Sequence, residues 1–528
     1  MNHLPKLIKN ICPDSKIAHN LKCGDNKCKS VITNVLASVS HDNLMNDLKT
    51  HKFSIILDES TDRSAIKHLA LVIRIVQAPL NIMDRFVTLI EVNSATSQAL
   101  YDHVIRFFND NNIPYKNNMI GYASDGANNM MGAHNSLATK LRNDIPNIFV
   151  FKCICHSFHL CASYACMKLP KYVEDVARDV YNYISNNPKR LCEYKEFQQF
   201  LNLKPHKLLH PAQTRWLSLH SVVKRILSQY SALKLYFTSA ALNDGLDNAK
   251  IILDRLTNPL TLMYFEFLDF VLPFFIDLNI EMQSTTVKIH VVYDKVGSLY
   301  KEILNCYMKK DYICTKEVNE IQYRNPEFFL DLKDIYLGGK VMASITQMLT
   351  EKKLTYAMIQ DFKLRCQCFY VEAANQVYQR FPFKLLQPLK HLKIICPETI
   401  FDNDVSSLGP MYASLPILFG DIDINEVDRE WRKLPFVHYE SAKIDRNTNI
   451  IDFWTYISKL KKGDETPMFP LMVFLVKNIM TLPHSSACVE RIFSMVNAIK
   501  TKERNRLQTD NLCGLLQTKS MLKASSSE

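Results

Sequence analysis

The stretch Phe53-Ser-Ile-Ile-Leu57, followed by Asp58-Glu-Ser-Thr-Asp62, decides the fold that we expect for this chain. Its first half is an apolar run of strand length, and its second half is acidic and polar. A second run, Met119-Ile-Gly-Tyr-Ala123, ends in the same way at Ser124-Asp125-Gly126. We therefore expect two strands that each lead into an acidic turn. Either aspartate by itself is explained by an ordinary turn or helix cap.

The segment between the two aspartates supplies the rest of a sheet. Leu69–Val76 and Arg85–Val92 are apolar and β-branched and favour strands, whereas Ser97–Phe108 has the spacing of a helix. Three strands, a helix and a fourth strand that carries Asp125 follow the order of an RNase H-like core. We predict an α/β RNase H-like core that is interrupted by a large all-α insertion, in a chain that is helix-rich overall. The low glycine content, 12 in 528 residues, agrees with many helices.

A third acid lies on a basic amphipathic helix near the C-terminus. In the block from Ser485 to Ser494, apolar residues recur at helical spacing, so that Glu490 lies at the edge of a buried stripe. An ion pair at the helix edge would explain a lone glutamate there. Two strand-end aspartates and a distant glutamate can instead form one site. Converging carboxylates repel each other unless cations lie between them, and their oxygens suit Mg²⁺ or Mn²⁺. The chemistry indicated is two-metal phosphoryl transfer.

Five motifs occur along the chain in an order that resembles the transposases of the hAT superfamily and host proteins derived from them. The motifs are Asp58-Glu-Ser-Thr-Asp62, Ser124-Asp125-Gly126-Ala-Asn, Cys153-Ile-Cys-His156, Thr214-Arg215-Trp216, and the block Ser485–Ser494 with Arg504-Asn-Arg506-Leu507. By this resemblance, Asp58, Asp125 and Glu490 would be the catalytic Asp-Asp-Glu triad of DNA strand cleavage and transfer. The resemblance also implies that the C-terminal block mediates self-association into a homodimer or higher homo-oligomer.

The resemblance further implies supporting and DNA-binding roles. Cys153 and His156 would lie beside the active site, and Trp216 would stack on a base extruded from the duplex, since an aromatic face offsets the cost of unstacking. Arg215 next to Trp216 would also bind DNA, and five further basic residues could contact phosphate, namely Arg491, Lys500, Lys502, Arg504 and Arg506. A place in the core also explains a lone Trp, and a solvated helix face explains basic residues equally well.

The start of the chain departs from the family pattern. Family members usually carry an N-terminal zinc finger of the BED type. Here Cys23 and Cys28 are the only early cysteine pair, and no paired His follows at finger spacing. We therefore expect this chain to lack the family's DNA reader. A second hypothesis stays open: a catalytically silent, domesticated or truncated protein that acts as a dimerising protein- or DNA-interaction module. A nuclease of the same fold without transposition is a third.

Cysteines and histidines crowd between Cys153 and Cys166, which suggests a zinc site. A helix over this run would scatter the ligands around its axis, so we expect packed thiols and no structural zinc. Fifteen cysteines without a visible signal peptide favour a reducing compartment. The most apolar stretch, Leu260 to Leu278, contains two acids and Pro273, so we expect a buried helix pair and no membrane span.

Charge and spacing complete the expected organisation. The net charge of +11 is compatible with DNA as a partner, either transposon ends or a related sequence. The nucleus is expected from function, since the chain shows no clear localisation signal. We expect four parts: short helices over 1–50, the first part of the RNase H-like core over 51–225, an all-helical insertion over 226–460, and a C-terminal dimerisation region over 461–528 that completes the core.

Overall fold

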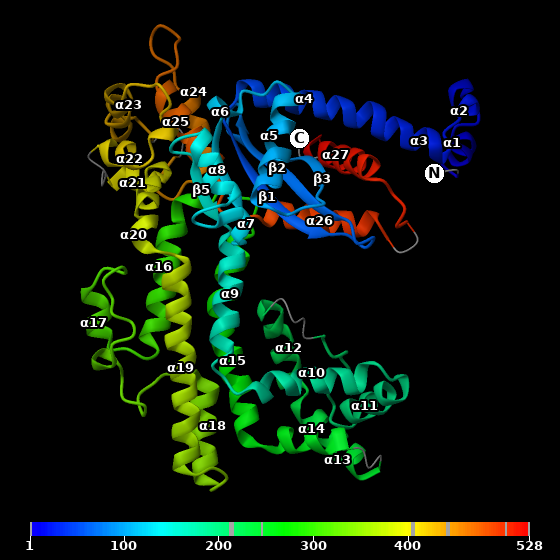
Figure 1. Ribbon diagram of the computed structural model, residues 1–528, viewed down its shortest axis with the longest axis vertical. Coiled ribbons are helices and arrows are strands. Elements are labelled where there is room, and N and C mark those ends of the chain that lie inside the picture. Colours follow the sequence, from blue (N-terminus) through cyan, green and yellow to red (C-terminus); the bar gives the residue numbers. More distant parts are fainter. Residues whose placement is uncertain are drawn as a thin grey trace. The chain divides into compact units, whose positions relative to one another are not determined.

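Two compact units make up the computed structural model, which describes residues 3–210, 216–243, 247–402, 407–439, 444–501 and 504–525. The first unit combines Met1–Cys153, Thr285–Val291 and Pro388–Glu528, and the second combines Ile154–Ser284 and Val292–Gln387. In Figure 1 the blue start and the red end of the chain therefore belong to the same unit. These bounds differ from the expected ranges 51–225 and 226–460, because the chain leaves the first unit directly after Cys153.

A mixed five-stranded sheet forms the centre of the first unit (Figure 1). Its order is β3-β2-β1-β4-β5, in which the first three strands are antiparallel neighbours and β4 and β5 run parallel to β1. The strands are β1 (Phe53–Thr61), β2 (Lys67–Gln77), β3 (Asn81–Glu91), β4 (Met119–Ser124) and β5 (Phe149–Lys152). The first four strands and helix α5 (Ser97–Asp110) confirm the sequence prediction. The fifth strand was not predicted, since four residues carry too little periodicity.

Strand β1 is longer than the sequence suggested. The expected acidic turn after Leu57 is wrong, because the antiparallel pairing of β1 with β2 continues through Asp58 to the pair Thr61↔Lys67. On its other side, the parallel pairing of β1 with β4 stops at Ile56↔Ala123. The segment that carries Asp58 is therefore an extended strand with one paired edge and one open edge.

The two faces of the sheet are covered by different parts of the chain. Side chains alternate between the faces along a strand. On one face Phe53, Ile55 and Leu57 pack in a cluster with α4 (Ala37–Thr50), α5 and α8 (Leu137–Asp144). On the other face Ile56 packs in a cluster with Val489 of α26 (Ala487–Ile499) and Leu512 of α27 (Thr509–Ser525). Nearby sequence thus builds the first face, and the far end of the chain builds the second.

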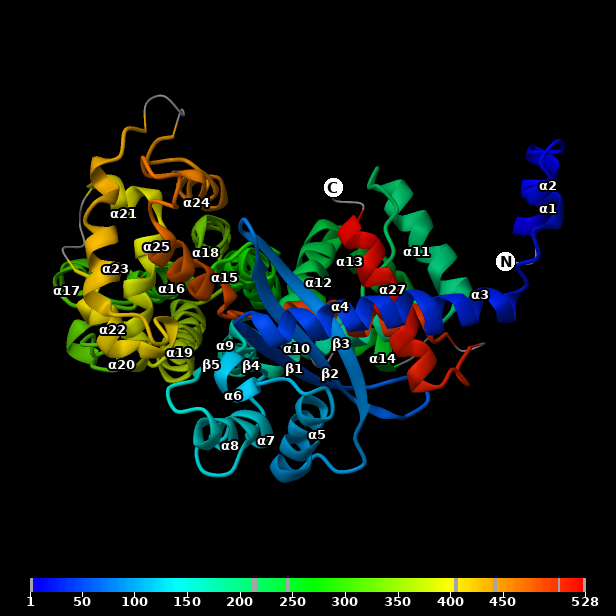
Figure 2. The ribbon, with the colours of Figure 1, turned by 90° about the horizontal axis from the view of Figure 1, so that it is seen from above.

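The chain enters the first unit through short helices. They are α1 (Leu4–Ile11), α2 (Lys16–Asn20), α3 (Asp25–Val31), a π-helical turn (Ile32–Leu36) and α4. The last three form one continuous helical run over 25–50, and α27 lies beside it (Figure 2). Further helices of this unit are α6 (Tyr115–Asn118), α7 (Asn128–Met131), α21 (Pro397–Asp402), α22 (Gly409–Ser414), α23 (Ile424–Trp431), α24 (Ile450–Lys459) and α25 (Pro470–Thr481).

Helices also form the second unit over its described residues, apart from an isolated bridge between Met308 and Phe329. They are α9 (Ile154–Cys166), α10 (Lys171–Ser185), α11 (Pro188–Phe200), α12 (Trp216–Ser228), α13 (Tyr230–Asn243), α14 (Asp247–Thr257), α15 (Pro259–Met282), α16 (Val292–Asn305), α17 (Lys310–Thr315), α18 (Gly339–Thr350), α19 (Tyr356–Arg380) and α20 (Phe383–Leu386). The chain is thus helix-rich with a small mixed sheet, as expected.

The prediction of a helix pair over Leu260 to Leu278 is wrong, because α15 spans this stretch. The apolar stretch is one continuous helix of 24 residues with Pro273 inside it. Among the described residues it is the one helix long and apolar enough to cross a membrane, and half of its most apolar window is buried inside the protein. Core helices of globular proteins have the same composition, and Phe267, Val271 and Phe275 are fully buried here.

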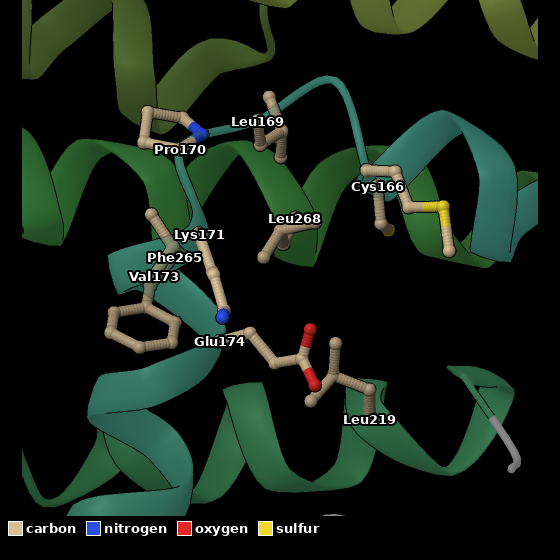
Figure 3. A pocket seen from close by; sticks show the side chains of 10 residues that line it. Cys166, Leu169, Pro170, Lys171, Val173, Glu174, Leu219, Phe265 and Leu268 are labelled. Carbon is tan, nitrogen blue, oxygen red and sulfur yellow. The ribbon is translucent and has the colours of Figure 1, made fainter. Parts of the chain in front are cut away.

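A cavity of about 290 Å³ lies within the second unit (Figure 3). Apolar side chains such as Leu169, Phe265 and Leu268 line it, and Lys171 and Glu174 lie at its wall. Glu174 is already bound by Arg178. This volume is at the lower end of the range for small-molecule sites.

Candidate active site at the edge of the mixed sheet

Strand register brings the two predicted aspartates side by side. Ile56 of β1 and Ala123 of β4 form the last pair between these strands; Asp58 lies two residues further along β1, and Asp125 comes directly after the end of β4. Neighbours in register on parallel strands point to the same face of the sheet. Asp58 follows Ile56 by two residues, so it points to the face that α26 covers. The register directs both carboxyl groups toward that face, and the charge of Asp125 raises the pKa of Asp58.

Cys153 continues the same row on the third parallel strand. Its backbone N–H donates to the carbonyl of Ser124, at 2.8 Å, which extends the pairing of β4 with β5 by one residue. The side chain is fully buried, and its Sγ accepts the backbone N–H of Ser486 at 3.3 Å. Cys153 thus connects the carboxyl ends of the strands to the segment that leads into α26.

Helix α26 carries the third acid to this edge. Val489 and Ile492 pack in one cluster with Ile56, and α26 contacts both β1 and β2. Glu490 comes directly after the buried Val489 and is itself half-buried. Its negative charge acts on Asp58. The charges of both Asp125 and Glu490 thus reach Asp58.

The electrostatics of the site are unfavourable for a bare carboxylate. Burial raises the pKa of Asp58 most, and the charges of Asp125, Cys153 and Glu490 raise it further, to about 8. The backbone N–H of Glu59, which donates to Asp58 Oδ1 at 2.9 Å, lowers it only in part. Asp125 accepts the backbone N–H of Ala127 at 3.2 Å. Bringing the carboxylates of Asp58, Asp125 and Glu490 close together costs electrostatic free energy, and a bound cation would lower that cost.

A close approach fixes the segment before α26 against the sheet. A Cβ on Gly121 would lie 2.3 Å from Ser54 Oγ and 3.0 Å from Cδ of Pro483. Only a residue without a side chain leaves room for both neighbours. Gly121 therefore allows Pro483 to pack against the paired residues Ser54 and Gly121. Ser54 precedes Asp58 by four residues, and Gly121 precedes Asp125 by four residues.

A buried ion pair fixes the other end of α26. Lys500 and Asp62 are 2% and 1% exposed in their side chains, and they form a salt bridge. His68 Nε2 lies 3.0 Å from the same carboxylate, which also accepts the backbone N–H groups of Ser64 and Ile66. Burial raises the pKa of Asp62, but these hydrogen bonds outweigh it and lower the pKa to about 2. The expected phosphate contact of Lys500 is therefore wrong, because this side chain is sealed in the interior.

A second buried pair holds the start of the same segment. Arg74 of β2 binds Asp84 of β3 through two hydrogen bonds of 2.7 and 2.9 Å. Its remaining nitrogen, Nη1, lies 3.4 Å from His484 Nδ1 and 3.5 Å from the carbonyl of Leu482. The links to this segment could not be recognised in the sequence, since Lys500 lies 438 residues from Asp62 and His484 lies 410 residues from Arg74.

The other predicted site residues, for DNA binding and for active-site support, divide into three groups. Arg491, Arg504 and Arg506 are exposed in the first unit, the last two in the turn between α26 and α27. Arg215 and Lys502 lie outside the described residues. Trp216 is the first residue of α12, and its side chain also lies outside them. His156 is half-buried on α9 of the second unit, so it is described apart from Cys153 and the acids.

The donor set indicates which metal would suit the site. Asp58, Asp125 and Glu490 offer carboxylate oxygens, which hard cations such as Mg²⁺ and Mn²⁺ prefer. Over the described ranges, no three Asp, Glu, His or Cys side chains already have the arrangement of a metal site. The acids thus fit these ions by chemistry, and ligation would require their side chains to turn toward a shared ion.

Two family models match this chain. The model described as ZMYM1/FAM200, RNase-like domain matches residues 6–136, which contain β1 to β4 and both aspartates. The model of the hAT family C-terminal dimerisation region matches residues 434–522, which contain α26 with Glu490 and most of α27. The first match agrees with the observed sheet, and the second supports self-association through the C-terminal region. Together the two matches support a transposase-derived protein of the hAT family.

Proposed function

We propose that this protein cleaves and transfers DNA strands at the site formed by Asp58, Asp125 and Glu490. The observation that carries the proposal is the convergence of these acids, from two neighbouring strands and a helix at the far end of the chain, on one edge of the sheet. Gathering like charges costs free energy, and such clusters are typical of functional sites. The matches to the hAT family models favour DNA strand cleavage and transfer as the class of reaction.

The three acids would hold Mg²⁺ or Mn²⁺ through their carboxylate oxygens. When bound, two such ions activate an attacking water or hydroxyl and stabilise the leaving oxygen of a phosphodiester. The chain's own part is positioning. Asp58 lies in β1 and Asp125 directly after β4, and the pair Asp62–Lys500 together with the contacts of Arg74 to Leu482 and His484 would hold α26 so that Glu490 can reach the same edge.

Other parts of the chain would serve the same reaction. Exposed arginines, Arg491, Arg504 and Arg506, would bind DNA phosphates, and Trp216 with Arg215 would hold an unstacked base. We infer that the helical second unit is the insertion of this family, since it lies in the sequence between Asp125 and Glu490. The nucleus would be the place of action, because the substrate is there.

Strand cleavage tests the proposal. Purified protein is incubated with pre-nicked or hairpin DNA and Mn²⁺, because pre-nicking lowers the need for sequence-specific recognition. Asp125→Asn keeps the side-chain volume and removes one metal-binding charge. We expect it to lose cleavage at least about a thousandfold while it still folds and associates.

The matched control is Asp110→Asn, which removes an exposed acid at the end of α5. This variant should cleave as the wild type does. Cleavage that survives in Asp58→Ala, Asp125→Asn and Glu490→Gln would contradict a carboxylate site. Circular dichroism and light scattering on every variant would separate loss of chemistry from loss of folding or association.

A second candidate function is a catalytically silent protein that dimerises and binds protein or DNA. The observation that favours it is the match over residues 434–522, which concerns dimerisation and not chemistry. A folded wild type that binds DNA and self-associates but does not cut, with either Mn²⁺ or Mg²⁺, would make this second function the better one.

A further inference from the structure

The C-terminal helix α27 is tightly joined to the N-terminal helical run over 25–50. A Cβ on Gly514 of α27 would lie 2.9 Å from Cγ2 of Thr33, so the two helices approach closely at this glycine. The Thr518 hydroxyl donates to the carbonyl of Ile32 at 3.1 Å. Both contacts fall on the π-helical turn Ile32–Leu36, where the wider turn alters the backbone pairing. The helical run is therefore part of the body that the dimerisation region builds.

The same run carries an exposed apolar stripe. Val31, Val35 and Val39 are 40%, 53% and 52% exposed, and they follow one another at intervals of four residues. Residues four apart on a helix lie on one side of it. Single exposed apolar residues are ordinary, but an aligned row of three valines is not. The short helices before the run add Ile11 and Ile17, which are 67% and 85% exposed.

Charges flank the stripe unequally. Lys27 and Lys29 are exposed before it, and Asp42 is exposed after it. Two copies of this helix that cross antiparallel about Val35 would place Val31 of each against Val39 of the other. They would also bring the lysines of each copy near Asp42 of the other. A parallel arrangement would instead oppose lysine to lysine. Opposite charges therefore favour a two-fold, antiparallel contact.

We propose that the stripe Val31, Val35 and Val39 is part of the self-association interface of this protein, and that its occupant is the same stripe of a second copy. The stripe is continuous with the dimerisation region, because α27 packs on the helix that carries it. An isologous pair of stripes buries both apolar faces at once. The inference rests on self-association and is independent of DNA cleavage.

Sedimentation of the full chain tests the proposal. We expect Val35→Glu to weaken the dimer at least about tenfold in Kd, since it puts a like charge on both sides of the two-fold axis. The matched control is Ile251→Glu, which changes an apolar residue of similar exposure, 47%, on α14 of the second unit. This control should keep the wild-type Kd. Circular dichroism would confirm that both variants fold.

A charge swap tests the direction of the contact. Lys27→Glu and Asp42→Lys should each weaken the dimer, and the double variant should recover most of the loss if the helices are antiparallel. A dimer that Val35→Glu leaves unchanged would overturn the proposal, as would a monomeric wild type or a stripe that is covered by another partner. Cleavage activity is measured in parallel, so loss of the dimer and loss of the chemistry are distinguished.

Discussion

The two faces of the central sheet have different origins. The face of Phe53, Ile55 and Leu57 is covered by helices that lie within residues 37–144, close to the strands in sequence. The face of Ile56 and Asp58 is covered by α26 and α27, from the far end of the chain. The apolar core of the first face needs only local sequence. Asp58 belongs to the second face, Asp125 follows β4 at its edge, and Glu490 lies on the helix that covers this face, so the candidate site forms only when residues near the two ends of the chain come together.

Breaking the anchor of the second face should have the largest effect on stability. Lys500→Met leaves the carboxylate of Asp62 buried without its cation, which is expected to cost about 3–5 kcal/mol in the free energy of unfolding. Urea unfolding measures this loss. The control Lys519→Met removes an exposed lysine of α27 and should change stability by less than about 0.5 kcal/mol. A loss below about 1 kcal/mol for Lys500→Met would mean that the pair does not anchor α26.

Two neighbouring residues of β1 compare the faces directly. Ile56 and Leu57 are both fully buried, and they point to opposite faces. Each change to Ala should cost about 2–5 kcal/mol. Hydrogen exchange should show which helices lose protection in each variant. Ile56→Ala should speed the exchange of backbone amides in α26 and α27, and Leu57→Ala should speed the exchange of amides in α5. The same exchange pattern in both variants would contradict separately built faces.

The acids of the second face should make stability depend on pH. Asp58 has a folded pKa of about 8, above the value near 4 of an unfolded chain, so the folded state binds the additional proton. This contribution to stability is fully present below about pH 4 and is lost progressively as the pH rises toward 8.

Thermal unfolding over this range measures the pH effect, and Asp58→Asn should flatten it. Added Mg²⁺ or Mn²⁺ should stabilise the wild type at pH 8, because a cation offsets the gathered charge, and should stabilise Asp58→Asn less. Equal stabilisation of both proteins by the metal would place the ion elsewhere.

Exposed arginines next to the second face should affect stability least. Arg491→Ala, Arg504→Ala and Arg506→Ala should each change the free energy of unfolding by less than about 0.5 kcal/mol. If they contact phosphate, each change should weaken DNA binding uniformly across sequences and lower the slope of log K against log salt by about one. Fluorescence anisotropy at several salt concentrations measures this slope. An unchanged slope would assign these side chains to a solvated helix face.

Much of the first face could be predicted from the sequence. The strands over 53–57, 69–76, 85–92 and 119–123 and the helix over 97–108 were identified, because local apolar periodicity reflects burial on a nearby core. The second face was harder. The length of β1 past Leu57 depends on its pairing with β2, and the burial of Lys500 depends on Asp62, more than 400 residues away. Local periodicity contains neither.

The sequence by itself determined the elements around the site and the family. Strand and helix periods are local properties, and the motifs around Asp58, Asp125 and Glu490 keep their order whatever the fold. Only the tertiary structure decided that Asp58 lies inside a strand, that Cys153 joins the row of strand ends, and that Lys500 anchors a helix instead of meeting DNA. These outcomes depend on register and on packing between distant segments, where the free energy comes from burying surfaces that are not neighbours in the chain.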